Sequence, residues 1–280
     1  MKTLAYLLLS AIIFCGSLTV NAQGLKLPAA SSGQTIIQDL GLGKVTVVYS
    51  RPDSKGRKML GGQEPYGTVW RTGANSATTI TFTDDVTIEG NKVPAGTYGL
   101  FSIPDPKEWT IILSKTSKTW GAYTYKQEDD FLRFKVKAMT MKEPVETFTI
   151  QFANVFPTSA DLTLAWEKTA FAFNIKTDVD ARVMASIDEA MKGEKKPYSA
   201  AAQYYYNNDK DLAKALEWIS IVEKNNPKSP SAKVWKARIQ LKMGDKKGAL
   251  ATAQEGVALA QAAKDGEYER LNAAVVAQAK

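Results

Sequence analysis

Apolar and polar residues alternate through much of the chain between residues 34 and 176. The alternating runs are short and rich in β-branched and aromatic residues, and turn residues separate them, which is typical of antiparallel strands. Each run predicts one buried and one exposed face, because successive side chains of a strand point in opposite directions. About nine or ten strands in roughly 140 residues fit a two-sheet antiparallel β-sandwich, with a closed barrel as the second choice. The predicted strands cover residues 45–49, 78–82, 86–88, 97–103, 109–113, 132–136, 148–152, 162–166 and 171–175.

A helical pattern replaces the alternation at Thr177 and Asp178, which are typical of a helix cap. The next apolar residues recur every fourth position, on one helical face that ends before Gly193. These residues are Val179, Val183, Ile187 and Met191. The change of period predicts a domain boundary, with a linking helix in residues 177–197 between a β-rich domain (residues 27–176) and a helical tail.

A repeat of 34 residues marks the tail, which covers residues 198–280. Asp211, Ala215 and Leu216 recur as Asp245, Ala249 and Leu250. The tail resembles tetratricopeptide repeats, which have this period, and the small alanines and the closing Asn226-Pro227 match that family. Lys233 departs from it, because the family has its first aromatic residue there. Two units and a closing helix in residues 267–279 predict a small tetratricopeptide-like hairpin stack.

Two repeats are fewer than the three that such stacks usually need for independent stability. We therefore expect the tail to pack on the β-rich domain or on the linking helix. The tail aromatic residues have two interpretations, which are packing between helices and a concave surface that grips a peptide or partner protein. They are Tyr204, Tyr205, Tyr206, Trp218 and Trp235.

The amino terminus has the pattern of a cleaved secretory signal in residues 1–22. Lys2 supplies a positive charge, residues 4–14 supply an apolar run, and cleavage is expected after Ala22. The run is shorter than the roughly 20 residues of a transmembrane anchor. Cys15 follows the bulky Phe14, which disfavours lipid attachment. The pattern predicts an exported protein in the periplasm or the extracellular space, without a transmembrane anchor.

Signal removal would leave a mature chain without cysteine, so disulfides would not contribute to its stability. The formal charge of +7 becomes about +6 without Lys2, and the basic residues are mixed with acids along the chain. A nucleic-acid-binding protein would show a basic stripe with aromatic residues between the charges. We therefore expect no nucleic-acid partner.

The sequence excludes most common catalytic chemistries. It contains no histidine, which removes Ser-His-Asp and Cys-His nucleophiles and the usual zinc sites, and it contains no phosphate-binding or dinucleotide-binding motif. We therefore predict no cofactor and no metal. Two acidic runs remain, Asp84-Asp85 and Glu128-Asp129-Asp130, and both abut turn-like sequence. Solvated turn acids are the simpler interpretation, although a glycosidase pair or a calcium site would use the same residue types.

Several separated motifs of the β-rich domain resemble one bacterial envelope family, the domain of unknown function 2911. They are Tyr49-Ser50-Arg51-Pro52, Lys55-Gly56-Arg57, the run from Pro65 to Asn75, Pro94-Ala95-Gly96-Thr97-Tyr98 and Leu164-Ala165-Trp166-Glu167. The resemblance covers residues 27–176. It implies an exported β-rich domain, and it carries over no activity and no catalytic residues.

Candidate ligand-binding residues lie in two places of this domain. Arg51, Lys55 and Arg57 belong to a glycine-containing loop, which is either an anion site or a solvated hairpin loop. Arg71 and Asn75 flank a turn, so a fixed fork of donors lies near an amide that both donates and accepts. The same two residues could instead fasten loop carbonyls in a sandwich.

Two functions follow from these patterns. The first is a noncatalytic module of the cell envelope that binds a small polar or anionic ligand near Arg71 and Asn75, with a tail that contacts a protein partner. The alternative is a carboxylate-dependent hydrolase that acts on envelope or extracellular material such as glycans. A purely structural role would require Arg71 to be buried and fully bonded to its own loops.

Overall fold

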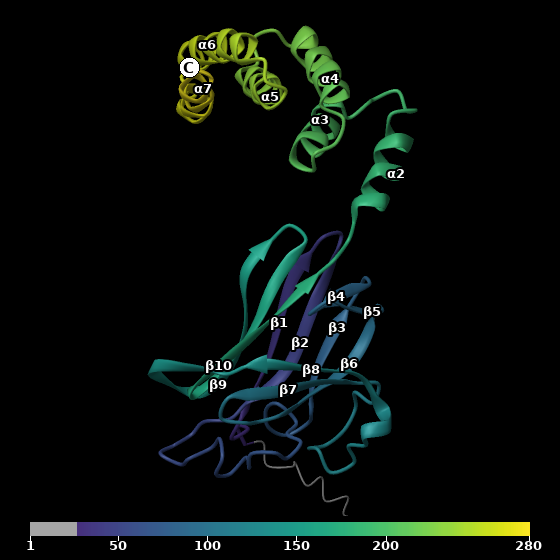
Figure 1. The fold of residues 1–280 in the computed structure, drawn as a ribbon, viewed down its shortest axis with the longest axis vertical. Coiled ribbons are helices and arrows are strands. Elements are labelled where there is room, and N and C mark those ends of the chain that lie inside the picture. Colours follow the sequence, from purple (N-terminus) through teal and green to yellow (C-terminus); the bar gives the residue numbers. More distant parts are fainter. Residues whose placement is uncertain (1–26) are drawn as a thin grey trace, which may run out of the picture. The chain divides into compact units, whose positions relative to one another are not determined.

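The structure, a computed structural model, describes residues 27–280 and divides the chain into two compact units (Figure 1). The first unit ends at Thr177 and is built from strands, and the second begins at Asp178 and is built from helices. The predicted signal sequence with cleavage after Ala22 lies outside the described residues. None of the helices between residues 27 and 280 has the length and the apolar run that crossing a bilayer would need.

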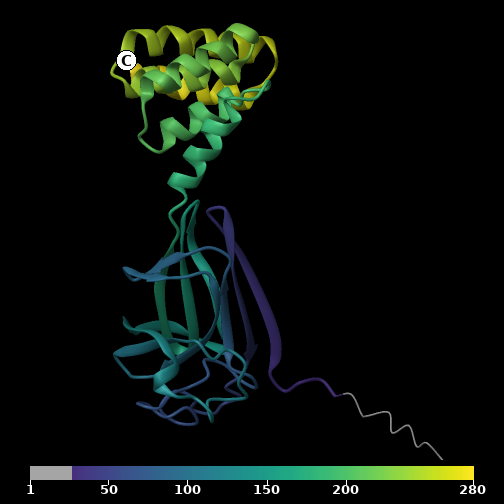
Figure 2. The same ribbon diagram turned by 90° about the vertical axis from the view of Figure 1, so that its right-hand side faces the viewer.

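Ten strands make up the β unit in this part of the chain, and all their pairings are antiparallel. One sheet has the order β1-β2-β3-β6-β7-β8 and the other has the order β5-β4-β10-β9, which confirms the predicted sandwich and not a barrel (Figure 2). The strands are β1 (Ser32–Leu40), β2 (Gly43–Arg51), β3 (Thr78–Phe82), β4 (Val86–Ile88), β5 (Asn91–Val93), β6 (Gly96–Ile103), β7 (Glu108–Ser114), β8 (Asp130–Lys137), β9 (Met139–Phe156) and β10 (Ser159–Lys176), with a short 3-10 turn η1 (Gln127–Asp129) before β8.

The inner faces of the two sheets share one hydrophobic core. Its largest fully buried side chains include Trp109 of β7, Phe148 of β9 and Trp166 of β10. Alternation puts Val45, Val47 and Tyr49 of β2 into this core. The buried residues are therefore the ones whose period-two pattern predicted the strands.

The runs at 162–166 and 171–175, predicted as two strands, form the single strand β10. Its buried residues switch from even positions, such as Trp166, to odd positions, such as Phe171. The pairing with β9 shifts at Glu167, whose φ is 50°. The register shifts leave the extra residues in β9, because the partner changes from Thr149 for Ala165 to Thr140 for Thr169. With this irregularity the apolar side chains of β10 stay on the inner face while their numbering changes parity.

The sequence analysis also missed two edge strands, β1 and β5. In β1 the half-buried inward positions include the polar Gln34 and Gln38, while Ile37 points outward and is exposed. An edge strand with polar residues on its inner face lacks the clean alternation from which strands are predicted. β5 has three residues, of which Val93 is the buried one.

Six helices form the second unit: α2 (Asp180–Ala190), α3 (Tyr198–Asn207), α4 (Leu212–Asn225), α5 (Pro230–Lys242), α6 (Lys246–Ala262) and α7 (Gly266–Ala279). Figure 2 shows α5, α6 and α7 lying roughly side by side. Ile187 of α2 belongs to the same apolar cluster as Tyr205 of α3 and Trp218 of α4. The tail is therefore packed on the linking helix, and the Tyr205 and Trp218 rings meet edge to face at 4.8 Å.

The 34-residue repeat corresponds to a repeated helix start. The Asp211 carboxylate accepts hydrogen bonds from the first-turn N–H groups of α4, and Asp245 does the same for α6. Ala215 and Ala249 follow four residues later, and both are fully buried. Small side chains at these positions let neighbouring helices approach closely. Lys233 stands where the repeat family has an aromatic residue, and its ammonium group pairs with carboxylates of α4 and α6.

Gly256 of α6 lies against Asn272 of α7, which is fully buried. The Asn272 amide nitrogen donates to the carbonyls of Pro230 and Tyr268 at 3.2 Å and 2.8 Å, so the side chain is held in place. A Cβ atom on Gly256 would lie 2.0 Å from the Asn272 Oδ1 atom. The glycine therefore makes room for an interhelical polar contact.

We expect Gly256→Ala to lower the free energy of unfolding of the helical unit by about 1–3 kcal/mol, because overpacking outweighs the better helix propensity of alanine. Gly266→Ala is the control, since Gly266 has open space around its missing Cβ atom. Urea unfolding followed by far-ultraviolet circular dichroism measures both. Equal stability of the two variants would contradict the role assigned to Gly256.

Candidate functional site

The long loop between β2 and β3, residues 52–77, contains the predicted site residues that follow Arg51, and Trp70 anchors it in the core. The Trp70 side chain is 2% exposed. It stacks on Trp166 at 5.6 Å and meets Phe148 and Trp109 edge on at 5.1 Å and 6.2 Å. Its backbone N–H donates to the Ser102 carbonyl at 2.7 Å and its carbonyl accepts from the Ser102 N–H at 2.9 Å. Both sheets therefore hold this point of the loop.

The segment after Trp70 has an unusual backbone. Thr72 and Asn75 have φ values of 53° and 59°, and Thr72 is fully buried. The Thr72 and Ser102 hydroxyls share a hydrogen bond of 2.8 Å, and the Thr72 carbonyl accepts from the Thr78 hydroxyl at 2.6 Å. A β-branched residue rarely adopts positive φ, at a cost of about 1–3 kcal/mol, and such residues cluster at functional sites. The surrounding bonds compensate for this strain.

The side chains of Arg57 and Lys55 interact within their own loop. Arg57 donates from Nε to the Ser54 carbonyl at 3.0 Å and from Nη2 to the Asp53 carbonyl at 2.7 Å. The Lys55 ammonium lies 3.5 Å from the Asp53 carboxylate, and its backbone N–H donates to Glu146 at 2.5 Å. Both cations thus stabilise the shape of the loop, which favours the interpretation as a hairpin loop.

Two contacts between residues far apart in the sequence join the loop and the end of β2 to the second sheet. The Glu167 carboxylate accepts the backbone N–H groups of Met59 and Leu60, both at 2.9 Å. Arg51 donates from Nε to the Phe148 carbonyl of β9 at 3.2 Å. Arg51 therefore joins the two sheets.

Asn75 also makes bonds within the fold. Its side-chain nitrogen donates to the Ser31 carbonyl and the Ser50 hydroxyl, both at 3.3 Å. Its backbone carbonyl accepts from the Gly121 N–H at 3.0 Å. Within residues 27–280, no side-chain hydrogen bond joins Asn75 to Arg71. The structure thus places the two predicted partners in one segment without bringing their side chains together.

Arg71 differs from the other predicted residues. Its Nε atom is buried and has no hydrogen-bond partner within residues 27–280, and the same holds for the indole Nε1 of Trp70. Glu64 is half-buried and interacts electrostatically with Arg71. The Trp70 indole N–H lies near the Glu64 carboxyl but outside the geometry of a full hydrogen bond. Glu64, Trp70 and Arg71 form the candidate site, with two donors and a carboxyl that have unused bonding capacity.

Burial raises the pKa of the Glu64 carboxyl, and the Arg71 charge and the Trp70 N–H act in the opposite direction without cancelling it. Sequence reasoning missed Glu64. Glu64 directly precedes the motif of residues 65–75, and this position could have identified it as a candidate site residue. Burial and the approach of Arg71 are properties of the folded loop, which no local pattern records.

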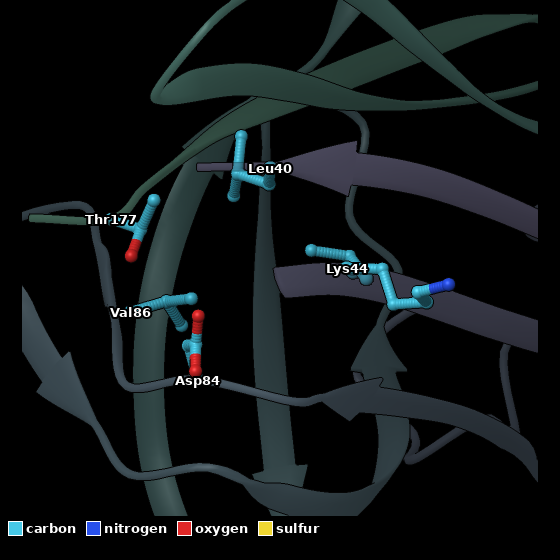
Figure 3. A pocket seen from close by; sticks show the side chains of 6 residues that line it. Leu40, Lys44, Asp84, Val86 and Thr177 are labelled. Atoms are coloured by element: carbon cyan, nitrogen blue, oxygen red, sulfur yellow. The ribbon is translucent and has the colours of Figure 1, made fainter. Parts of the chain in front are cut away.

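The hollows described in the structure lie away from this site. One of about 230 Å³ is lined by Glu89, Asn174 and Lys176 of the β unit, and one of about 280 Å³ lies beside Trp218 in the helical unit. Figure 3 shows a crevice near Thr177 and Asp84, where the Lys44 ammonium points away from the other labelled side chains. This crevice leaves no room for a water molecule.

Three acids of the two acidic runs accept hydrogen bonds within the β unit. Asp85 accepts the Ala95 N–H at 2.9 Å, and Asp129 accepts the Thr116 hydroxyl at 3.0 Å. Asp130 accepts the Tyr125 hydroxyl at 2.8 Å. Across the part of the chain that is described, no group of three acids is placed to hold a metal ion.

The family model described as "Protein of unknown function (DUF2911)" matches residues 31–175. The match covers more than half of the chain and confirms the resemblance of the β-rich domain. The chain therefore belongs to this family. No curated protein and no solved structure matches the chain.

We expect Glu64→Gln to stabilise the protein at neutral pH. The pKa of Glu64 is raised in the folded state, so folding favours the protonated carboxyl. This contribution is fully present below the ordinary pKa of 4.5 and is lost as the pH rises through the higher folded value. Glutamine keeps the neutral form at every pH, so the variant and the wild type should converge in acid and separate at neutral pH.

Urea unfolding at neutral pH and below pH 4.5 measures this difference, with the exposed Glu128→Gln as control. A Glu64→Gln variant that is less stable at neutral pH would show that attraction to Arg71 outweighs the cost of burial.

Proposed function

Because the chain belongs to a family of unknown function, we propose its function from the site: the β unit is a noncatalytic module that binds a small polar or anionic ligand at Glu64, Trp70 and Arg71. One observation carries this proposal, which is that two buried N–H donors lack partners beside a half-buried carboxyl. Buried donors in proteins are almost always hydrogen-bonded, and an unpaired one costs about 1–3 kcal/mol. A ligand oxygen that accepts these bonds removes that cost.

The three side chains offer complementary chemistry to such a ligand. The planar guanidinium of Arg71 matches carboxylate or phosphate oxygens. The Trp70 indole donates one further bond in a fixed direction, because the core holds its ring. Glu64 accepts a hydroxyl or amide proton of the ligand when ionised and donates its own when protonated.

Two observations support binding over the other functions. A carboxylate-dependent hydrolase needs a second carboxyl about 5–9 Å from the first. The acids Asp85, Asp129 and Asp130 instead accept hydrogen bonds from other parts of the β unit. A purely structural role would leave Arg71 fully bonded, and its Nε atom is not.

The helical unit supplies the second half of the proposal, which is contact with a protein partner. Its stacked helices resemble an interaction module, and an open hollow of about 280 Å³ is lined by Tyr198, Trp218, Lys196 and Glu217 among others. The signal-like pattern of residues 1–22 supports action outside the cytoplasm, in the periplasm or beyond the cell.

The test is a thermal-shift screen with inorganic phosphate, acetate, succinate and N-acetylated amino acids. A ligand of the folded state stabilises it by about 2.7 kcal/mol at a concentration of 100 times its Kd, so at least one probe should raise the Tm. We expect Arg71→Gln to abolish that shift, because it removes the charge that matches the anionic probes.

Arg57→Gln is the matched control, because Arg57 lies on the same loop and bonds only loop carbonyls in the described structure. It should keep the shift, and Arg71→Lys should keep part of it by preserving the charge. A shift that survives in Arg71→Gln, or the absence of any shift in the wild type, would refute the proposed site.

A further inference from the structure

Two aromatic side chains are exposed on the loop between β7 and η1, residues 115–126. Trp120 is 67% exposed and Tyr123 is 85% exposed. Large aromatic residues usually bury most of their surface. The sequence contains six tryptophans, and Trp120 is the exposed one.

The loop is well packed, so loose folding does not explain this exposure. Its Tyr125 ring lies 5.2 Å from the Phe101 ring, and Phe101 belongs to a second, smaller core with Ile112 and Ala77. The Tyr125 hydroxyl donates to the Asp130 carboxylate at 2.8 Å. The loop therefore half-buries Tyr125 and leaves the two other large aromatic residues exposed.

Backbone bonds fix the position of the exposed pair. The Gly121 N–H donates to the Asn75 carbonyl, and the Ala77 N–H donates to the Thr119 carbonyl, both at 3.0 Å. Gly121 has a φ of 68°, and a Cβ atom there would lie 2.7 Å from the Tyr123 ring. The Tyr123 ring thus folds back against the glycine, and both aromatic residues are presented on a rigid loop.

We propose that Trp120 and Tyr123 bind a neutral glycan, with sugar rings stacked on the two aromatic faces. A pyranose ring offers a face of C–H groups that packs on an aromatic ring, and hydroxyl groups at its rim that bond to polar neighbours. Ser76, which pairs with Trp120 across a β-bridge, and Thr124 are exposed hydroxyl residues beside the pair.

The size of the patch favours a sugar over a protein. Stable protein interfaces bury about 800 Å² on each partner and involve roughly 20–30 residues a side. Two aromatic side chains on a short loop offer much less, whereas they match one or two sugar rings. This site goes beyond the proposed function, because it shares no side chain with Glu64, Trp70 and Arg71.

Affinity gel electrophoresis in soluble β-glucan, xylan and galactomannan tests the proposal. At least one glycan should retard the wild-type protein. Trp120→Ala and Tyr123→Ala should each weaken binding about tenfold, a loss of about 1.4 kcal/mol. Trp120→Phe should retain part of it, because an aromatic face remains. The bound glycan should also protect tryptophan fluorescence from acrylamide, since Trp120 is the exposed indole.

Phe156→Ala is the matched control, because Phe156 is 62% exposed in the same unit but lies at the end of β9. It should bind like the wild type, and so should Arg71→Gln, which separates this site from the proposed ligand site. Three results would overturn the proposal: no retardation by any glycan, unchanged retardation of Trp120→Ala, or a wild-type dimer in sedimentation that Trp120→Ala makes monomeric.

Discussion

The insertion of Trp70 between the two sheets is the interaction on which the rest of the β unit depends. Its ring touches side chains of both sheets, namely Trp109, Phe148 and Trp166. The loop of residues 52–77 is therefore packed into the core at its middle and not only at its ends. Because Arg71 follows directly, its guanidinium is held at the rim of the core, where the Nε atom loses water without gaining a partner. The candidate site is thus a consequence of how the sandwich is closed.

The irregularity at Glu167 affects both the packing of β10 in the core and the position of the loop of residues 52–77. The positive φ of Glu167 accompanies the change of parity in β10, so its apolar side chains stay on the inner face while the pairing with β9 shifts. The same backbone conformation accompanies a carboxylate that binds the N–H groups of Met59 and Leu60. In a regular strand the side chains would alternate strictly between the inner and the outer face, without the local irregularity that accompanies the Glu167 contact. The strand register and the position of the loop are therefore linked through one residue.

The sequence predicted what depends on local periodicity and missed what depends on contacts made after folding. β3 and β4 were predicted with their observed bounds. The sequence repeat paired Asp211 with Asp245, and in the structure both are the residues that cap the start of a helix. The continuity of β10 was missed because a bulge looks like a turn when only the alternation is read. At the site, Arg71 was recognised by its charge and its place beside a turn. Glu64 was missed because its raised pKa results from burial, which is a tertiary property.

The segment from Trp70 to Ala77 explains why one short motif carries so many constraints. Trp70 packs in the core, and Thr72 adopts a strained backbone conformation. The Asn75 carbonyl bonds to the loop that contains Trp120. Each role needs a different residue type, and the strain at Thr72 persists because bonds on both sides hold it. Loss of the Trp70 side chain would remove the core anchor of this segment, so it would disturb the position of both the Glu64–Arg71 cluster and the aromatic loop. The two surfaces have separate chemistry but share one rigid support, and their integrity is therefore coupled through the core.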